Sequence, residues 1–151
     1  MNICEQAEAF RLLLLMGVVD KKEIISWADS IISTQDNLPE WLLDLSVAAN
    51  HDTATIEAKL RELPGEWSRI SAAYAAITRF TNEFQINDKF TSPEAAHMLA
   101  VWAESAKVNQ EDRAVAIMPS WIADEVPHGY AVDQDIVESI KKCITHFAAK
   151  A

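Results

Sequence analysis

Hydrophobic residues recur along this chain every three or four positions, which is the spacing of a helix with one apolar face. The clearest example begins at Asp20, an N-cap residue type followed three positions later by Glu23. The apolar face of this predicted helix consists of Ile24, Ile25, Ala28, Ile31 and Ile32. Valine, isoleucine and threonine do not alternate with polar residues over any long run, and only three glycines occur. The sequence therefore predicts an all-α protein.

Residues that begin or end helices divide the chain into seven or eight predicted helices. Gly17 suits the end of the first helix, and Pro39 suits the first turn of the third. Ser92 followed by Pro93 is a strong start signal for a later helix. The clearest of the predicted helices cover 3–16, 20–33, 39–50, 52–63, 66–84, 92–107 and 133–149.

Two longer segments are predicted to differ in regularity. The helix at about 66–84 is expected to be the central one, because its large apolar residues recur at helical spacing and its alanines allow neighbouring backbones to approach closely. The segment 109–130 is expected to be less regular, because Pro119 and Pro127 each end or kink a preceding helix. At 151 residues, the whole chain (1–151) is expected to form one compact domain.

The net charge of −10 is distributed unevenly along the chain. Seven acidic residues and no lysine or arginine lie between 23 and 57, namely Glu23, Asp29, Asp36, Glu40, Asp44, Asp52 and Glu57. Five more acidic residues, again without a basic one, lie between 114 and 140, namely Asp124, Glu125, Asp133, Asp135 and Glu138. The remaining positions carry 11 acidic and 13 basic residues. The pattern indicates a nearly neutral body with two acidic zones.

Membrane insertion, export and nucleic-acid binding are not supported by the N-terminal third of the chain. The apolar run at 12–19 is far shorter than the ~20 residues that span a bilayer. Glu5 and Glu8 stand where an export signal has basic residues. The turn after the first helix is reminiscent of a helix-turn-helix, but the second helix offers only Lys21 and Lys22 before the acidic zone begins. We therefore expect neither a membrane nor a nucleic acid as partner.

The two cysteines lie near opposite ends of the chain and outside any paired motif. Cys4 and Cys143 are therefore expected to be reduced thiols. This cysteine usage predicts a cytoplasmic protein.

Two short patterns resemble parts of metal sites without completing one. Glu94-x-x-His97 has the spacing of a di-iron half-site, and Cys143-x-x-His146 has ligand-like spacing, but each stands alone in the sequence. We expect no metal, no cofactor and no catalytic residue. An enzyme or a small-ligand-binding protein with a site between helices stays open as an alternative. A pocket that joins buried acids to His97 or His128 would support that alternative.

Five tryptophans are many for a chain of this length. Trp67 and Trp102 are expected in the core, whereas Trp27, Trp41 and Trp121 lie within or beside the acidic zones. An aromatic anchor among acids is what a binding surface for a basic protein uses. The alternative is a solvated acidic face whose tryptophans cover the edge of the core.

The first acidic zone is therefore the predicted partner-binding site. It is predicted to bind a basic protein through Trp27, Asp29, Asp36, Glu40, Trp41 and Asp44. A further alternative is a structural homo-oligomer, such as a dimer, formed through exposed tryptophans.

The segment 12–46 carries Gly17-Val18-Val19, then Trp27-Ala28-Asp29, then Pro39 and the Leu-Asp-Leu-Ser sequence at 43–46. It resembles a recurring N-terminal segment of small, uncharacterised, all-helical bacterial proteins, some of which look like immunity partners of secreted toxins. The resemblance implies a protein that neutralises a toxin by binding it, and it brings no catalytic residue.

Overall fold

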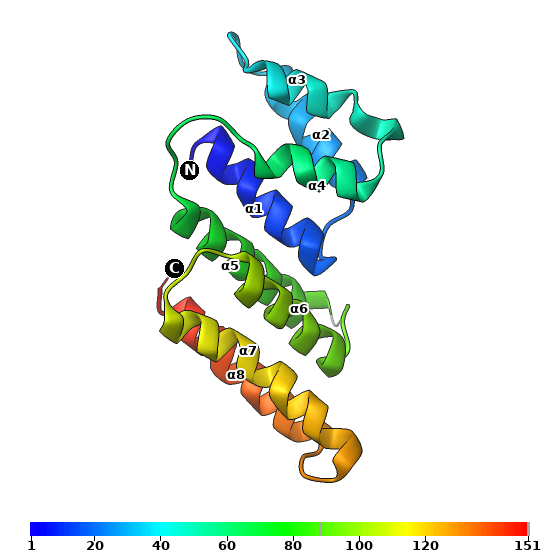
Figure 1. The fold of residues 1–151 in the computed structure, drawn as a ribbon, viewed down its shortest axis with the longest axis vertical. Helices are drawn as coiled ribbons and strands as arrows, with labels where there is room; N and C mark the ends of the chain where they lie inside the picture. Colours follow the sequence, from blue (N-terminus) through cyan, green and yellow to red (C-terminus); the bar gives the residue numbers. More distant parts are fainter. Residues whose placement is uncertain (88, 151) are drawn as a thin grey trace.

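The computed structural model describes residues 1–87 and 89–150 (Figure 1). In this part of the chain there are eight α-helices, two short 3-10 helices and no β-strand, which confirms the all-α fold. The α-helices are α1 (Ile3–Met16), α2 (Lys21–Ile32), α3 (Glu40–Ser46), α4 (Thr53–Arg61), α5 (Arg69–Asn87), α6 (Ser92–Ser105), α7 (Gln110–Glu125) and α8 (Asp133–Ala148). The 3-10 helices are η1 (Ala48–Asn50) and η2 (Val126–His128). Among the described residues, no helix is both long and apolar enough to cross a membrane.

The helices form an elongated stack (Figure 1). The helices α2 and α3 lie at one end, α1 and α4 come next, α5 and α6 follow, and the antiparallel pair α7–α8 forms the other end. Helix α1 contacts α4 as well as α5 and α6, and α6 packs along α7. Helix α5, which corresponds to the helix expected at 66–84, lies in the middle and contacts both α1 and α8.

The turn between α1 and α2 has the predicted end signals. Gly17 adopts a left-handed backbone with φ 78°, and its N–H donates to the Leu14 carbonyl at 3.0 Å. Asp20 is the N-cap of α2, and its carboxylate accepts the Glu23 N–H at 3.0 Å. The apolar stretch at 10–32 is therefore a pair of helices whose leucines and isoleucines belong largely to the core.

Two other helices begin at a different residue from the expected one. Thr91, rather than Ser92, caps α6: the Thr91 hydroxyl accepts the Glu94 N–H at 3.4 Å, and the Glu94 carboxylate accepts the Thr91 N–H at 2.8 Å. Helix α5 starts later than predicted, directly after Ser68, whose hydroxyl accepts the Ser71 N–H at 3.1 Å. In both cases a side chain satisfies a first-turn donor of the helix, so the start follows from local capping chemistry.

The segment 109–130 is more regular than predicted. Helix α7 runs through Pro119, which is buried inside it, and ends only at Glu125. Proline removes one backbone donor from a helix, but the packing of α6 and α8 along α7 stabilises the remaining turns. Pro127 lies in η2, directly after α7, and so only the second proline coincides with the end of the helix.

The core joins α5, α6 and α8 through Trp102. This side chain is fully buried, meets the Phe147 ring edge-on at 5.0 Å, and donates its indole N–H to the Ala73 carbonyl at 3.0 Å. Trp67, which was also expected in the core, is only half-buried, and the Arg69 guanidinium lies 4.8 Å from its ring. Trp67 therefore packs against the edge of the core and not inside it, because this residue precedes α5 instead of lying within its apolar face.

Candidate functional site

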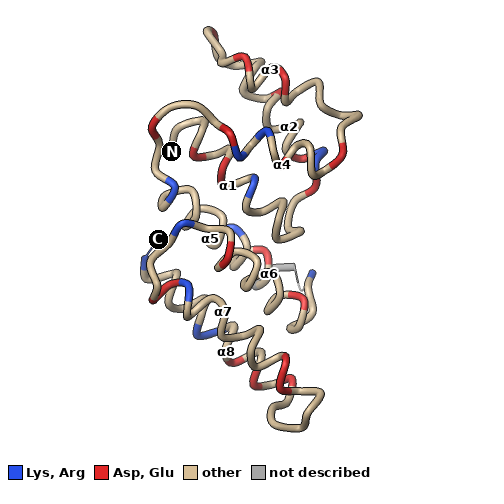
Figure 2. The backbone as a smooth tube through the Cα atoms, in the orientation of Figure 1, with Lys and Arg blue, Asp and Glu red and all other residues tan. Residues whose placement is uncertain are grey.

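The two acidic zones lie at opposite ends of the stack (Figure 2). The zone at 23–57 covers α2, α3, η1 and the start of α4. The zone at 114–140 covers most of α7, the turn through η2, and the first half of α8. The helices between them carry residues of both charges (Figure 2). The zones therefore form two separate surfaces, which we call the α2–α3 end and the α7–α8 end.

Three of the seven acids in the first zone are used inside the fold. Glu23 of α2 pairs with Arg79 of α5. Asp52 caps α4 by accepting the Thr55 N–H at 2.7 Å, and hydrogen bonding from Thr55 lowers the pKa of the Asp52 carboxyl. Glu57 is buried and pairs with arginines of α1 and α4. These three carboxylates are therefore occupied with holding helices in place.

The other four acids of the zone are Asp29, Asp36, Glu40 and Asp44. Asp29 lies on α2, Asp36 lies in the loop that follows, and Glu40 and Asp44 lie one turn apart on α3. All four residues are exposed. Within the described part of the chain, none of them has an ion-pair partner. Their charges are therefore open to a partner from outside.

Trp27 packs against α1, on a different side of α2 from the exposed Asp29. Its ring lies 5.0 Å from the Phe10 ring of α1, and its indole N–H donates to the Gln6 side-chain oxygen at 3.1 Å. Asp29 follows two residues later and points about 200° away around the helix. The structure therefore does not bring Trp27 together with the exposed acid of its own helix.

Trp41 does lie beside an exposed acid. It is half-buried on α3 and lines a pocket of about 190 Å³ together with Asp44, Leu60 and Lys59. This pocket opens between α3 and α4, and its apolar wall would accept a side chain from a partner. Lys59 follows the acidic zone in the sequence and brings one positive charge to the rim, which the sequence pattern alone did not indicate.

The α7–α8 end combines acids with exposed apolar side chains. All five acids of the second zone are exposed there. Trp121, which the sequence singled out, is 54% exposed, and Tyr130 and Val132 are more exposed still, at 82% and 61%. Tyr130 and Val132 lie in the short segment between α7 and α8. The sequence there has no helical apolar spacing that would assign these two residues to the core, and this was the signal that could have identified them.

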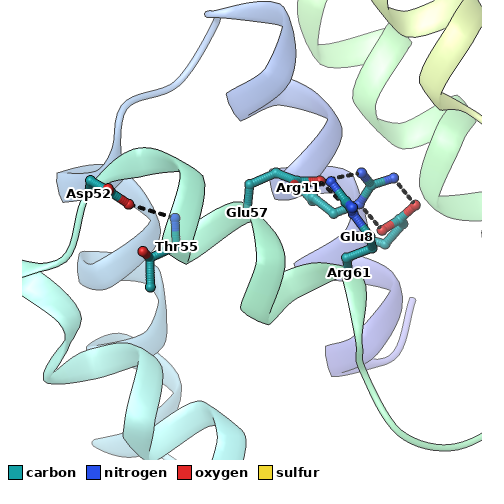
Figure 3. A network of polar contacts seen from close by, with 6 residues as sticks. All are labelled: Glu8, Arg11, Asp52, Thr55, Glu57 and Arg61. Carbon is teal, nitrogen blue, oxygen red and sulfur yellow. Dashed lines mark hydrogen bonds and ion pairs between the residues drawn. The ribbon is translucent and has the colours of Figure 1, made fainter.

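A buried ion network between α1 and α4 was missed by sequence reasoning (Figure 3). Arg11 donates to both oxygens of Glu8, at 2.6 and 2.8 Å, and to Glu57 at 2.8 Å. Arg61 also donates to Glu57, at 2.6 and 3.2 Å. Burial raises the pKa of Glu57, but the hydrogen bonds from the two arginines outweigh burial and lower it. The network fixes α4 on α1 and thereby supports the α2–α3 end.

A third buried carboxylate, outside that network, was also missed. Asp112 on α7 is fully buried, and it accepts hydrogen bonds from the Tyr74 hydroxyl and from the Lys150 ammonium. Its carboxylate also lies 2.6 Å from His146 Nε2 of α8 and accepts the Asn109 amide at 2.8 Å. Burial raises the pKa of Asp112, but the hydrogen bonds from Lys150, Tyr74 and His146 outweigh burial and lower it to about 2. The arrangement ties the C-terminal helix to α5 and α7.

The two patterns with metal-like spacing have structural roles or exposed positions. Glu94 completes the capping box of α6 with Thr91, while His97 and also His128 are exposed. Cys143 is fully buried, which raises the pKa of its thiol to about 12, and His146 pairs with a carboxylate rather than with the thiol. In the part of the chain that is described, no three histidine, cysteine or acidic side chains gather in a way that could hold a metal ion.

The comparisons with known proteins add no relative. No family model matches the chain, and no match was found among the curated proteins or among the solved structures.

Proposed function

We propose that this protein is an interaction module that binds a basic protein partner through its α2–α3 end. The observation that carries the proposal is that Asp29, Asp36, Glu40 and Asp44 are exposed and have no ion pair among the described residues. Their exposed carboxylates complement lysines and arginines, which accelerates association and excludes acidic partners. A cytoplasmic location fits the two reduced cysteines.

The action proposed for this surface is occlusion, as in an immunity protein that covers a toxin. The four acids would pair with lysines and arginines that the partner uses on its own substrate. A side chain of the partner would enter the pocket beside Trp41, which supplies a partly desolvated anchor next to Asp44. Trp27, by contrast, contributes by holding α2 against α1.

Affinity capture from lysate with three baits tests the proposal. The baits are the unchanged protein, a variant with Asp29→Asn, Asp36→Asn, Glu40→Gln and Asp44→Asn, and a control variant. The control removes three negative charges, against four in the first variant, at exposed acids outside both acidic zones, namely Glu66→Gln, Glu104→Gln and Glu111→Gln. Mass spectrometry of the three captures should identify a basic protein that the first variant loses and the control retains.

The affinity of the recovered partner is then measured with purified proteins at several salt concentrations. We expect the dissociation constant to rise with salt, because the Debye length falls from ~30 Å at 0.01 M to about 8 Å at 0.15 M. We expect a smaller salt dependence for the variant at the α2–α3 end. If the three baits capture the same proteins with the same affinity, these four acids do not bind the partner.

A further inference from the structure

A groove runs between α7 and α8, at the end of the molecule opposite to the proposed site. It consists of two pockets of about 230 and 430 Å³ that share Met118, Ser139 and Lys142 and therefore adjoin. The smaller pocket extends to Cys143, and the larger extends to Ile122. Every residue that lines them belongs to α7 or α8, so the groove follows the seam of this helix pair.

Large apolar side chains are exposed in and beside this groove. Met118, in the groove, is 43% exposed, and Trp121 lies one turn further along α7. Tyr130 and Val132 extend the exposed apolar residues into the turn that joins the two helices. Single exposed apolar side chains are ordinary, whereas several of them at one end of a molecule, together with a groove, are a feature of interaction surfaces.

The charged residues that line the groove are two acids and one lysine, all on α8. Asp135 and Glu138 line the end near the turn, and this end belongs to the acidic zone at 114–140, which contains no lysine or arginine. Lys142, about one turn beyond Glu138 on α8, lines both pockets and brings one positive charge to the groove, so the two acids of the lining outnumber its one lysine. An apolar floor with acids at its rim is complementary to a segment that has an apolar face flanked by basic residues.

We infer that this groove binds a basic amphipathic helix of another protein. The lining extends over eight residue steps on each helix, from 114 to 122 on α7 and from 135 to 143 on α8, which corresponds to about 12 Å, or two helical turns. A helix of that length presents apolar residues at i, i+3, i+4 and i+7, which is the usual mode of helix recognition in a groove.

A second copy of this chain fits the groove less well than a basic helix does. Each copy would bring the five acids of its own α7–α8 end to the contact, and like charges at an interface oppose association. The inference uses a different surface from the α2–α3 end, so either one can fail without the other.

Methyl NMR of the methionine-labelled protein tests the inference with a defined probe. The probe is a synthetic amphipathic peptide of leucine and lysine, about 14 residues or four helical turns long. Of the four methionines, Met118 lies in the groove and Met16 is buried in α1, so Met16 serves as an internal reference. We expect the Met118 signal to shift on titration while the Met16 signal stays in place, and a matching leucine–glutamate peptide to cause no shift.

Three variants separate the groove from general charge attraction. Asp135→Asn with Glu138→Gln should weaken peptide binding about tenfold, which corresponds to about 1.4 kcal/mol. Asp29→Asn with Asp44→Asn changes the charge equally at the other end and should leave the affinity within about twofold. Met118→Glu adds an attractive charge but removes the apolar floor, and we expect it to weaken binding.

The result that overturns the inference is equal weakening by both double variants, or unchanged affinity of Met118→Glu, because the peptide would then bind by charge alone. A Met118 signal that depends on protein concentration without peptide would also overturn it, since a second copy would then fill the groove. If the acids of the α2–α3 end prove unnecessary for the captured partner while the peptide still shifts Met118, only the proposed function fails.

Discussion

Arg11 of α1 donates a hydrogen bond of 2.8 Å to Glu57 of α4, although the two residues are 46 positions apart and both side chains are buried (Figure 3). The contact joins the first helix to the helix that follows the acidic α2–α3 end. Taking two charges out of water is costly, and the cost is offset only when their hydrogen bonds are satisfied. Here Arg11 is held by Glu8 as well, and Glu57 by Arg61.

Removal of Arg11 is therefore expected to destabilise the protein strongly. Arg11→Met leaves the buried Glu8 carboxylate without its arginine partner, and we expect the free energy of unfolding to fall by about 3 kcal/mol. Urea unfolding followed by circular dichroism measures the change. The matched control is Arg61→Met, since Arg61 pairs with the same Glu57 but its side chain is 64% exposed, and its loss should cost less than about 1 kcal/mol. Equal effects of the two variants would contradict this assignment.

Features that depend on neighbouring residues in the sequence, such as the capped turns, could be predicted, whereas this network of distant residues could not. The end of α1 at Gly17 and the start of α2 at Asp20 depend on residues within four positions, and both were predicted. Arg11 lies within an apolar run, and its partner Glu57 is distant in sequence, so periodicity gave no signal for the pair. The effect of Pro119 was also predicted wrongly: α7 continues through it, because helices that are distant in sequence stabilise α7 around it.

The stability that Asp112 contributes is expected to disappear in acid. Its pKa is lowered from the ordinary 3.8 to about 2 in the folded protein, so the ionised form is favoured by folding. Such a contribution is complete above the unfolded pKa and is lost as the pH falls from about 4 through about 2. We expect Asp112→Asn to lower the free energy of unfolding by about 3 kcal/mol at pH 7 and by progressively less below pH 4.

Urea unfolding between pH 7 and pH 2 measures this difference. Glu111→Gln is the matched control, because Glu111 is the exposed acid that precedes Asp112 in the first turn of α7. The control should stay within about 0.5 kcal/mol of the unchanged protein at every pH. A constant gap between Asp112→Asn and the unchanged protein down to pH 2 would show that the lost stability does not come from the ionised carboxylate.

The two cysteines are expected to differ in reactivity. Cys143 is fully buried, and burial raises its thiol pKa to about 12, so almost no thiolate forms at neutral pH. Cys4 is half-buried, and burial together with the neighbouring Glu5 raises its pKa less. In a colorimetric thiol titration of the folded protein at pH 8, we expect slow reaction at Cys4 and none at Cys143. Cys4→Ser should abolish the reaction of the folded protein, while unfolding in urea should still release the Cys143 thiol. Rapid labelling of Cys143 in that variant would mean that the α7–α8 pair opens readily.

The acidic zone shows the limit of sequence reasoning about the site. The absence of lysine and arginine from 23–57 is visible in the sequence, and it identified the surface. Which of its acids are used inside the fold and which are free for a partner depends on tertiary contacts. Glu23 and Glu57 pair with arginines from other helices. Asp29 and Asp44 pair with none in the described part of the chain. Trp27 and Trp41 were both predicted to bind the partner, because the sequence does not show which side of a helix is covered by a neighbouring helix.

Trp27 and Trp41 are expected to respond oppositely to substitution. Trp27→Phe removes the indole hydrogen bond to Gln6, so we expect the free energy of unfolding to fall by about 1 kcal/mol while the affinity for the captured basic partner stays within about twofold. Trp41→Ala removes the wall of the pocket beside Asp44, and we expect the affinity to fall at least tenfold, or about 1.4 kcal/mol. Urea unfolding and isothermal titration calorimetry separate the two effects, with Trp121→Ala at the other end as the control for loss of an exposed indole. If Trp27→Phe weakens partner binding as much as Trp41→Ala does, the partner contacts the α1–α2 side, and the pocket between α3 and α4 is not its anchor.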